Sequence, residues 1–221
     1  MGKKAIPIGI ENFEDIIKDN YYYVDKSMLI EDILVNRAAV TLFTRPRRFG
    51  KTLNMSMIKY FFDVRNKDEN RKLFEGLKIF GSEYMKEQGK YPVIFVSLKD
   101  LRADTWEDTF ENLKSFISDL YAEFEDMREI MNKRDKIKFD KIFYEEEKGD
   151  YETSLKLLSN YIYKYYGKKV IILIDEYDAP IINAFDKGYY NEAINFFQVF
   201  YSSALKTNDS LKYGILTCLL Y

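Results

Sequence analysis

The tripeptide Gly50-Lys51-Thr52 has the residue types and the order of a phosphate-binding loop. It lies between a short β-prone run, residues 38–44, and a segment with helical spacing of apolar residues, 51–63. A glycine loop that leads from a strand into a helix directs several free backbone N–H groups at one point, with the positive end of the helix dipole behind them. In such a loop Lys51 would reach the β- and γ-phosphates of a nucleotide, and the Thr52 hydroxyl would ligate Mg²⁺.

The motif departs from its usual form. The glycine that usually stands five positions before the second glycine is Arg45 here, which restricts φ where the loop turns, and Pro46 would compensate by stiffening that turn. Gly-Lys-Ser/Thr also arises by chance in about one chain in ten of this length. An ordinary capped helix N-terminus is therefore the alternative interpretation of the tripeptide.

An acidic pair, Asp175-Glu176, ends the most strand-like run of the chain, residues 169–174. A phosphate-loop enzyme needs a carboxylate at the end of a neighbouring strand to hold the Mg²⁺ shell, and a hydrolase of the additional-strand class needs a second one to orient and polarise water. We therefore expect Asp175 to be the metal residue and Glu176 the base. A charged strand end without function is the alternative, but residues 50–52, two β/α segments earlier, favour the functional interpretation.

Three more charged residues stand near these motifs. Arg47 and Arg48 would pair with phosphate oxygens, or Arg48 with a carboxylate of the protein, because the planar guanidinium matches both groups. Asp178 would add negative charge around the metal or simply occupy a turn.

The composition limits the chemistry to carboxylates, lysine, arginine, hydroxyls, backbone amides or a bound ion. The 221 residues include no histidine and one cysteine, Cys218, which excludes histidine-dependent catalysis, thiolate zinc clusters and intrachain disulfides. With 34 Lys+Arg against 36 Asp+Glu, the net charge of −2 argues against a strongly basic nucleic-acid binder but leaves room for a local patch.

The 221 residues and their 47% apolar content predict a globular protein of one large domain or two small ones. No run reaches the ~18 apolar residues that a membrane span needs. The N-terminus also lacks the apolar core of a signal peptide. We therefore expect a cytoplasmic protein without a membrane partner.

Strand-like and helical segments alternate along the chain. Apolar, β-prone runs predict strands at residues 38–44, 92–98, 169–174 and 211–220. Helical spacing predicts helices at residues 51–63, 106–131, 154–166 and 190–206, the third ending at Gly167. The alternation indicates an α/β fold, a parallel sheet with helices on both faces.

Two segments fall outside this alternation. Residues 1–37 precede the first core strand, and the charge-rich residues 132–150 predict a solvated connection or a mobile insertion. The long helix at 106–131 is expected to face the core, with a helix–helix or oligomer seam as the alternative.

At five strings the chain resembles the predicted AAA-ATPase-like proteins of bacteria and archaea. They are residues 6–13 (Ile-Pro-Ile-Gly-Ile-Glu-Asn-Phe), 22–27 (Tyr-Tyr-Val-Asp-Lys-Ser), 44–53 (Thr-Arg-Pro-Arg-Arg-Phe-Gly-Lys-Thr-Leu), 173–180 (Leu-Ile-Asp-Glu-Tyr-Asp-Ala-Pro) and 211–217 (Leu-Lys-Tyr-Gly-Ile-Leu-Thr). The third string is specific to this family, in which arginine at position 45 is ordinary.

The resemblance implies a single ATP-binding P-loop domain of the additional-strand type over residues 1–221, with ATP and Mg²⁺ as cofactors. Glu176 and Lys51 keep the roles given above, and Thr217 would be a polar sensor residue beside them. Thr52 and Asp175 would serve the metal. A weaker expectation is an adenine or ribose contact at residues 23–26. The residues expected to contact the nucleotide are Arg47, Arg48, Phe49, Gly50, Lys51, Thr52 and Leu53.

The chain departs from the family in its C-terminal part. Family members usually continue for hundreds of residues, often into a restriction-endonuclease-like nuclease domain. In the last strand Cys218 replaces a usual glycine, and Tyr221 stands where an arginine is usual. We expect a four-stranded sheet with this strand between the other two motif-bearing strands, lacking the fifth strand and the lid. One edge of the phosphate-loop strand would then be unpaired and open to a homo-oligomer or a partner protein.

Three functions are consistent with these observations. The first is Mg²⁺-dependent ATP binding with hydrolysis, which makes the chain an ATPase. The second is a nucleotide-binding module without significant turnover. The third is a component of a nucleic-acid-processing system, which rests on the nuclease domain of family members and on Arg45, Arg47 and Arg48.

Overall fold

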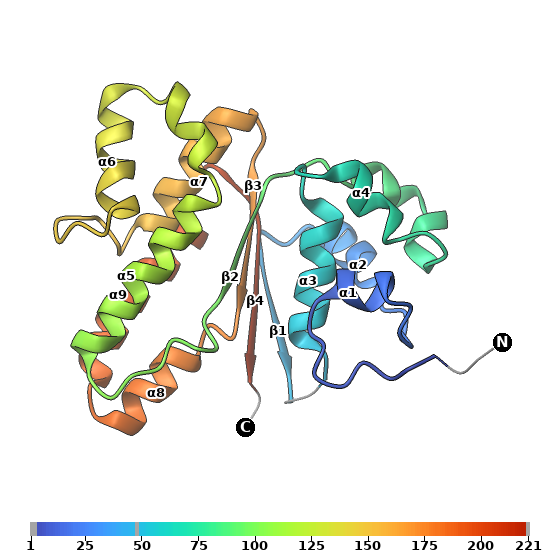
Figure 1. The fold of residues 1–221 in the computed structure, drawn as a ribbon, viewed down its shortest axis with the longest axis horizontal. Helices are drawn as coiled ribbons and strands as arrows, with labels where there is room; N and C mark the ends of the chain where they lie inside the picture. The colour runs from blue at the N-terminus through green and yellow to red at the C-terminus, as the bar shows by residue number, and fades with distance from the viewer. Residues whose placement is uncertain (1–3, 47–48, 220–221) are drawn as a thin grey trace.

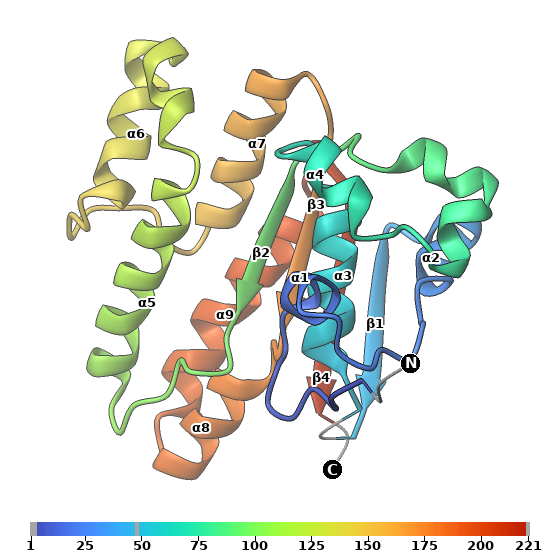
Figure 2. The ribbon, with the colours of Figure 1, turned by 45° about the vertical axis from the view of Figure 1, so that its right-hand side comes forward.

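A four-stranded parallel sheet forms the centre of the molecule in the computed structural model, which describes residues 4–46 and 49–219 (Figure 1, Figure 2). Its strands are β1 (Val40–Arg45), β2 (Val93–Ser97), β3 (Val170–Asp175) and β4 (Leu211–Leu219). Their order is β1-β4-β3-β2, and every neighbouring pair is parallel. The four predicted strands and the predicted place of the last one, between β1 and β3, are therefore confirmed.

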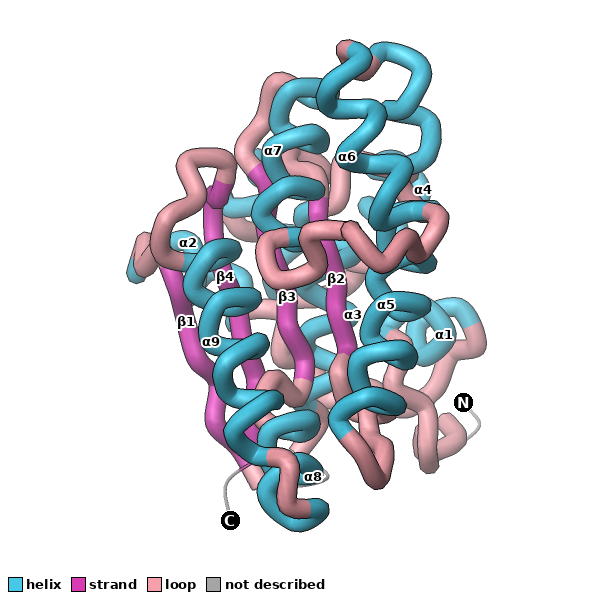
Figure 3. The backbone as a smooth tube through the Cα atoms, turned by 90° about the vertical axis from the view of Figure 1, so that its left-hand side faces the viewer, coloured by secondary structure: helices cyan, strands magenta, loops and turns pink. Residues whose placement is uncertain are grey.

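Helices cover both faces of the sheet, as the α/β pattern predicted (Figure 1, Figure 3). On one face lie α1 (Phe13–Lys18), α2 (Leu29–Asn36), α3 (Lys51–Phe62) and α4 (Lys67–Lys72), followed by the short 3₁₀ helices η1 (Lys78–Gly81) and η2 (Glu83–Glu87). On the other lie α5 (Trp106–Ala122), η3 (Glu125–Ile130), α6 (Lys133–Phe143), α7 (Ser154–Tyr166), α8 (Ala179–Lys187) and α9 (Tyr190–Leu205).

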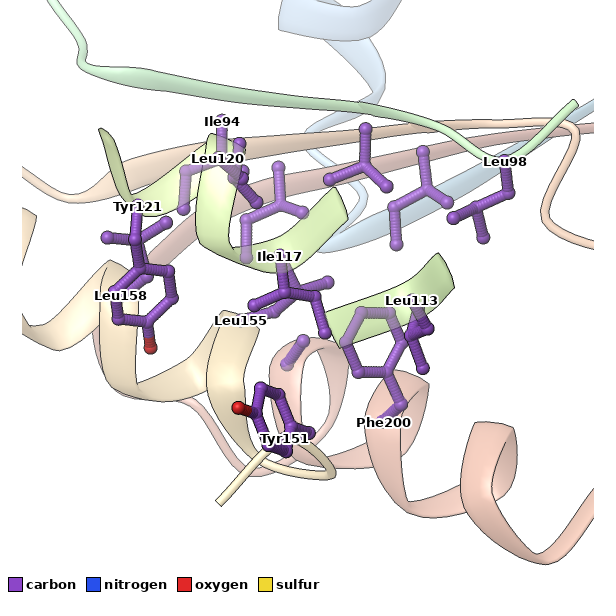
Figure 4. Packing of buried hydrophobic residues seen from close by; sticks show 14 of the residues in the cluster. Ile94, Leu98, Leu113, Ile117, Leu120, Tyr121, Tyr151, Leu155, Leu158 and Phe200 are labelled. Carbon is purple, nitrogen blue, oxygen red and sulfur yellow. The ribbon is translucent and has the colours of Figure 1, made fainter. Parts of the chain in front are cut away.

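The two helical layers enclose two hydrophobic cores that share β3. Ile172 and Ile174 pack with the α5, α7 and α9 side chains of Figure 4, whereas Ile171 and Leu173 pack with α3. All four side chains are fully buried. Successive side chains of a strand point to opposite faces, so a continuous apolar run suits a strand that is covered on both sides. Burial of each aliphatic side chain contributes about 1.5–3 kcal/mol to stability, so this run stabilises β3 in the centre of the fold.

The long helix predicted at residues 106–131 is shorter in the structure. The α5 helix ends at Ala122, and the 3₁₀ helix η3 follows at Glu125–Ile130. Phe124 and Met127 are buried all the same. The apolar spacing therefore continued past the helix end because the chain still lies against the core, not because it stays α-helical.

The segment at residues 132–150 is not only a solvated connection, because α6 occupies its first half. Asn132 caps α6 by accepting a hydrogen bond from the backbone N–H of Asp135. Phe139 and Ile142 are fully buried. The prediction of a connection was wrong for this helix because charged residues dominate its composition, which hid the two apolar residues, three positions apart, that pack into the core.

The N-terminal segment contributes to the α3-side core. Asn12 caps α1, and the backbone N–H of Phe13 donates to Ser56 Oγ on α3 at 3.0 Å. Phe13 and Ile30 are fully buried. Residues before β1 therefore help to hold α3 in position.

The β1 strand pairs only with β4 among the described residues, so its other side is an open sheet edge, as predicted. Val40 and Leu42 on this strand are 40% and 48% exposed. No helix within the described part of the chain is long and apolar enough to cross a membrane.

Candidate functional site

The carboxyl ends of the four parallel strands meet at one edge of the sheet, and both sequence motifs lie there. The β1 strand leads into the loop before α3, while β3 ends at Asp175. Thr217 is near the end of β4, the strand between them. Ligand sites of open α/β sheets lie at this edge, so the topology places the candidate site where such proteins bind ligands.

The loop after β1 leads directly into the N-terminus of α3. Gly50 is the N-cap residue and has φ 72°, ψ 31°, a left-handed conformation that glycine adopts without steric cost. No side chain caps the first turn of α3 within the described residues. The N–H groups of this turn therefore remain suited to an anionic ligand.

Lys51 is the first residue of α3 and is 91% buried, with 9% of its surface exposed. Its Nζ donates to the carbonyl oxygen of Pro46 at 3.1 Å, so the side chain folds back over the loop. A second ammonium lies near, because Lys26 Nζ is 3.9 Å from the position that a Cβ atom on Gly50 would take. Two cations thus lie at the loop that the sequence assigned to phosphate.

Thr52 and Asp175 join the two motifs. The Thr52 hydroxyl donates to Asp175 Oδ2 at 2.7 Å, although the residues are 123 positions apart. Thr217 Oγ1 donates a hydrogen bond to Asp175 Oδ1. The Asp175 side chain is fully buried, so both of its oxygens are held by hydroxyl groups from neighbouring elements.

Glu176 lies beside this carboxylate in a strained conformation. Its φ is +52°, a left-handed value that is uncommon for a residue with a side chain. Its backbone N–H donates to Thr217 Oγ1 at 3.0 Å, which helps to hold that conformation. Partial burial raises the pKa of its carboxyl above the usual value, and the charge of Asp175 raises it further, while Lys51 and Arg102 oppose the shift. A carboxyl group with a raised pKa is better suited to accept a proton near neutral pH.

The loop after β2 carries basic residues whose charges act on Glu176. The charge of Arg102 partly opposes the raised pKa of Glu176. The pKa of Lys99 is raised mainly by its hydrogen bond with Glu11, with a smaller contribution from the charge of Glu176. Lys99 also pairs with Glu11 at 2.8 Å. No sequence pattern singled out Lys99 or Arg102, because they come near Glu176 only through the pairing of β2 with β3.

A cavity of about 480 Å³ opens beside the loop, between α2, α3 and β1. It reaches Lys51 and Thr217 and is otherwise lined mainly by apolar side chains. The lining residues are Lys26, Met28, Leu29, Asp32, Phe43, Phe49, Lys51, Asn54, Met55, Ile58 and Thr217. This volume falls within the range of small-molecule sites.

Some of the predicted site residues lie around Asp175, and others lie farther away or outside the described residues. Lys51, Thr52, Asp175, Glu176 and Thr217 lie together. Phe49 borders the cavity with 58% of its surface exposed, and Leu53 packs against the α3-side core. Arg47 and Arg48 lie outside the described residues. Asp178 is the N-cap residue of α8.

The oxygen ligands present suit Mg²⁺ better than a softer metal. Thr52 supplies a hydroxyl and Asp175 a carboxylate at the end of a phosphate-type loop. No group of three or more His, Cys, Asp or Glu side chains is placed to hold a metal among residues 4–46 and 49–219. Mg²⁺ is usually bound through one or two carboxylates together with phosphates of the substrate, so this small ligand set fits it.

Fold and site define an α/β protein whose loop-to-helix junction meets an acidic strand end at the carboxyl edge of a parallel sheet. The chain belongs to the Predicted AAA-ATPase family, whose model matches residues 7–220. This membership supports nucleotide binding of the ATPase type. A protein from Azotobacter chroococcum mcd 1, described as "Uncharacterized protein in vnfD 5'region", is 26% identical over 186 residues. The match covers 83% of this chain but 31% of that protein's length. No solved structure matches the chain.

Proposed function

We propose that the chain is a P-loop domain of the additional-strand class that binds ATP with Mg²⁺ and hydrolyses it. The observation that carries the proposal is the 2.7 Å hydrogen bond between Thr52 and Asp175, because it joins the phosphate-type loop to the acidic strand end. The sheet order supports the same class, since β4 separates the strands that carry the two motifs.

The nucleotide would bind across the loop with its phosphates at the N-terminus of α3. The N–H groups of the first turn and the Lys51 ammonium would hold the β- and γ-phosphates, with Lys51 exchanging the Pro46 carbonyl for phosphate oxygen. The mainly apolar cavity beside Lys51 would take the base. The charged phosphates would thus contact N–H groups and an ammonium group, and the base would contact mainly apolar side chains.

Thr52 and Asp175 would hold Mg²⁺, which when bound neutralises developing negative charge on the phosphates. Glu176 would orient the attacking water and accept its proton, since its pKa is raised by burial. Thr217 would fix both carboxylate-bearing residues, because it contacts the side chain of Asp175 and the backbone of Glu176.

Calorimetric titration of ATP with Mg²⁺, together with measured phosphate release, tests this proposal. Lys51→Ala should weaken ATP binding by about 30-fold or more, as expected when one partner of a buried charge pair is removed. Lys59→Ala is the matched control, because Lys59 lies on the same helix but over the Phe95 ring. ATP binding by Lys51→Ala that equals the parent's would refute the proposal.

Glu176→Gln separates hydrolysis from simple binding. The variant should still bind ATP. It should release phosphate at least about 100-fold more slowly than the parent, as expected when a general base is lost. Equal release rates with intact binding would instead identify a nucleotide-binding module without significant turnover.

We also propose that the open edge of β1 is a surface for self-association. The strand pairs on one side only within the described sheet, and Leu42 on it is about half exposed. Unpaired strand edges with apolar side chains readily pair with a second chain.

A further inference from the structure

Ser97, the last residue of β2, has a buried hydroxyl oxygen without a hydrogen-bond partner among the described residues. Its backbone is in register with Asp175 on the neighbouring strand. Adjacent strands are about 4.8 Å apart, so the two residues are direct neighbours at the carboxyl edge of the sheet.

The Ser97 and Asp175 side chains project from the same face of the sheet. Val93 and Phe95, four and two positions before Ser97, belong to the α3-side core, and Leu173, two positions before Asp175, belongs to the same core. Because side chains alternate along a strand, Ser97 and Asp175 both point to the side on which α3 presents Thr52.

The neighbouring hydroxyl groups are used differently. Thr52 and Thr217 each donate to one oxygen of Asp175, so both carboxylate oxygens already accept hydrogen bonds. Thr217 comes from β4, on one side of β3, and Ser97 from β2, on the other. The Ser97 hydroxyl thus completes a row of polar groups across three strands but does not join their hydrogen bonds.

A buried hydroxyl without a partner costs stability, and native proteins contain few of them. Alanine at position 97 would avoid this cost. A buried polar group without a protein partner is expected at a functional site, where a ligand supplies the missing hydrogen bond.

We propose that Ser97 is a positioning residue of the nucleotide site, whose hydroxyl accepts a hydrogen bond from a water molecule in the hydration shell of the bound Mg²⁺–nucleotide complex. The inference rests on the proposed function. Mg²⁺ usually keeps several waters when it binds proteins, and Asp175 with Thr52 leaves room in its coordination shell for them. Ser97 is the polar side chain next to Asp175 on the β2 side of β3.

The proposal makes opposite predictions for the empty and the loaded protein. Ser97→Ala should raise the melting temperature of the ligand-free protein by about 2–4 °C, since it removes an unsatisfied hydroxyl. It should also weaken binding of ATP in the presence of Mg²⁺ by about three- to tenfold, the range for one hydrogen bond. Ser97→Thr keeps a hydroxyl and should bind like the parent.

Tyr161→Phe is the matched control. Tyr161 on α7 carries the other hydroxyl that is buried without a partner within the described residues, and it lies in the core on the opposite face of the sheet. Tyr161→Phe should raise the melting temperature in the same way and leave ATP binding unchanged. The experiment is calorimetric titration of each variant with ATP, once with Mg²⁺ and once with EDTA.

The affinity loss of Ser97→Ala should be present with Mg²⁺ and absent with EDTA, which a purely structural role would not produce. Equal affinities of Ser97→Ala and the parent with Mg²⁺, or the same loss in both solutions, would overturn the inference while leaving the proposed function standing. Failure of the parent itself to bind ATP would overturn both.

Discussion

Thr217→Val should destabilise the protein more than most single substitutions at a strand end. The Thr217 hydroxyl is buried, donates to Asp175 and accepts from the backbone N–H of Glu176. Valine keeps the shape of the side chain but makes neither bond. The substitution therefore leaves a buried carboxylate oxygen of Asp175 and the partly buried N–H group of Glu176 without their partner.

The magnitude follows from these two bonds. A hydrogen bond to a charged group contributes about 1.5–3 kcal/mol and a neutral one about 0.5–1.5 kcal/mol. Together they predict a loss of about 2–4 kcal/mol in the free energy of unfolding. For a chain of this size each kcal/mol shifts the melting temperature by about 2–4 °C, so a loss near 3 kcal/mol lowers it by about 6–12 °C.

Thermal and urea unfolding, followed by circular dichroism, measure this loss. Thr217→Ser is the control, since serine keeps the hydroxyl and should retain most of the stability. A Thr217→Val protein as stable as the parent would refute the reasoning, because it would mean that the hydroxyl does not hold the buried carboxylate.

Two further predictions concern Glu176 and β1. Because burial raises the pKa of Glu176 above its value in the unfolded chain, the folded protein binds this proton more tightly, and the contribution of Glu176 to stability falls as the pH rises from about 4.5 through the raised pKa. Glu176→Gln should therefore match the parent in urea unfolding at pH 4 and exceed it at pH 7; a gain that is equal at both pH values contradicts this. Leu42→Lys should abolish self-association of the parent in light scattering at high protein concentration, since lysine on an edge strand opposes pairing; a parent that stays monomeric contradicts the proposed edge contact.

Sequence patterns predicted the elements whose apolar spacing is long and regular. The run at 169–174 became β3, and the helix at 154–166 ends as predicted, with Gly167 at φ 63°. The α8 helix was not predicted, although Pro180 stands in its first turn and Gly188 follows its end, a common arrangement. Its nine residues are too few for a clear helical period, so only these end residues indicate it.

The candidate site was easiest to propose where the chemistry is local in sequence. Residues 50–52 were assigned their proposed roles from the order strand, glycine loop and helix, and Asp175 from its place at a strand end, and the structure brings Thr52 and Asp175 together. Ser97 and Arg102 were missed for another reason. Nothing in the residues around them differs from an ordinary strand end, and they lie near Asp175 and Glu176 only because β2 is beside β3.

Backbone conformation marks the site independently of the sequence motifs. Within the described residues, five side-chain-bearing residues have positive φ: Asn20, Arg37, Asn66, Glu145 and Glu176. The first four are exposed, and asparagine tolerates this conformation well. Glu176 is partly buried and directly follows a fully buried carboxylate. Residues held in sparsely populated conformations persist when the surrounding structure over-determines them, and they concentrate at functional sites. Thr217 supplies that constraint from the next strand, so the strain at Glu176 and the hydrogen bonds of Asp175 support the same candidate site as the phosphate-type loop.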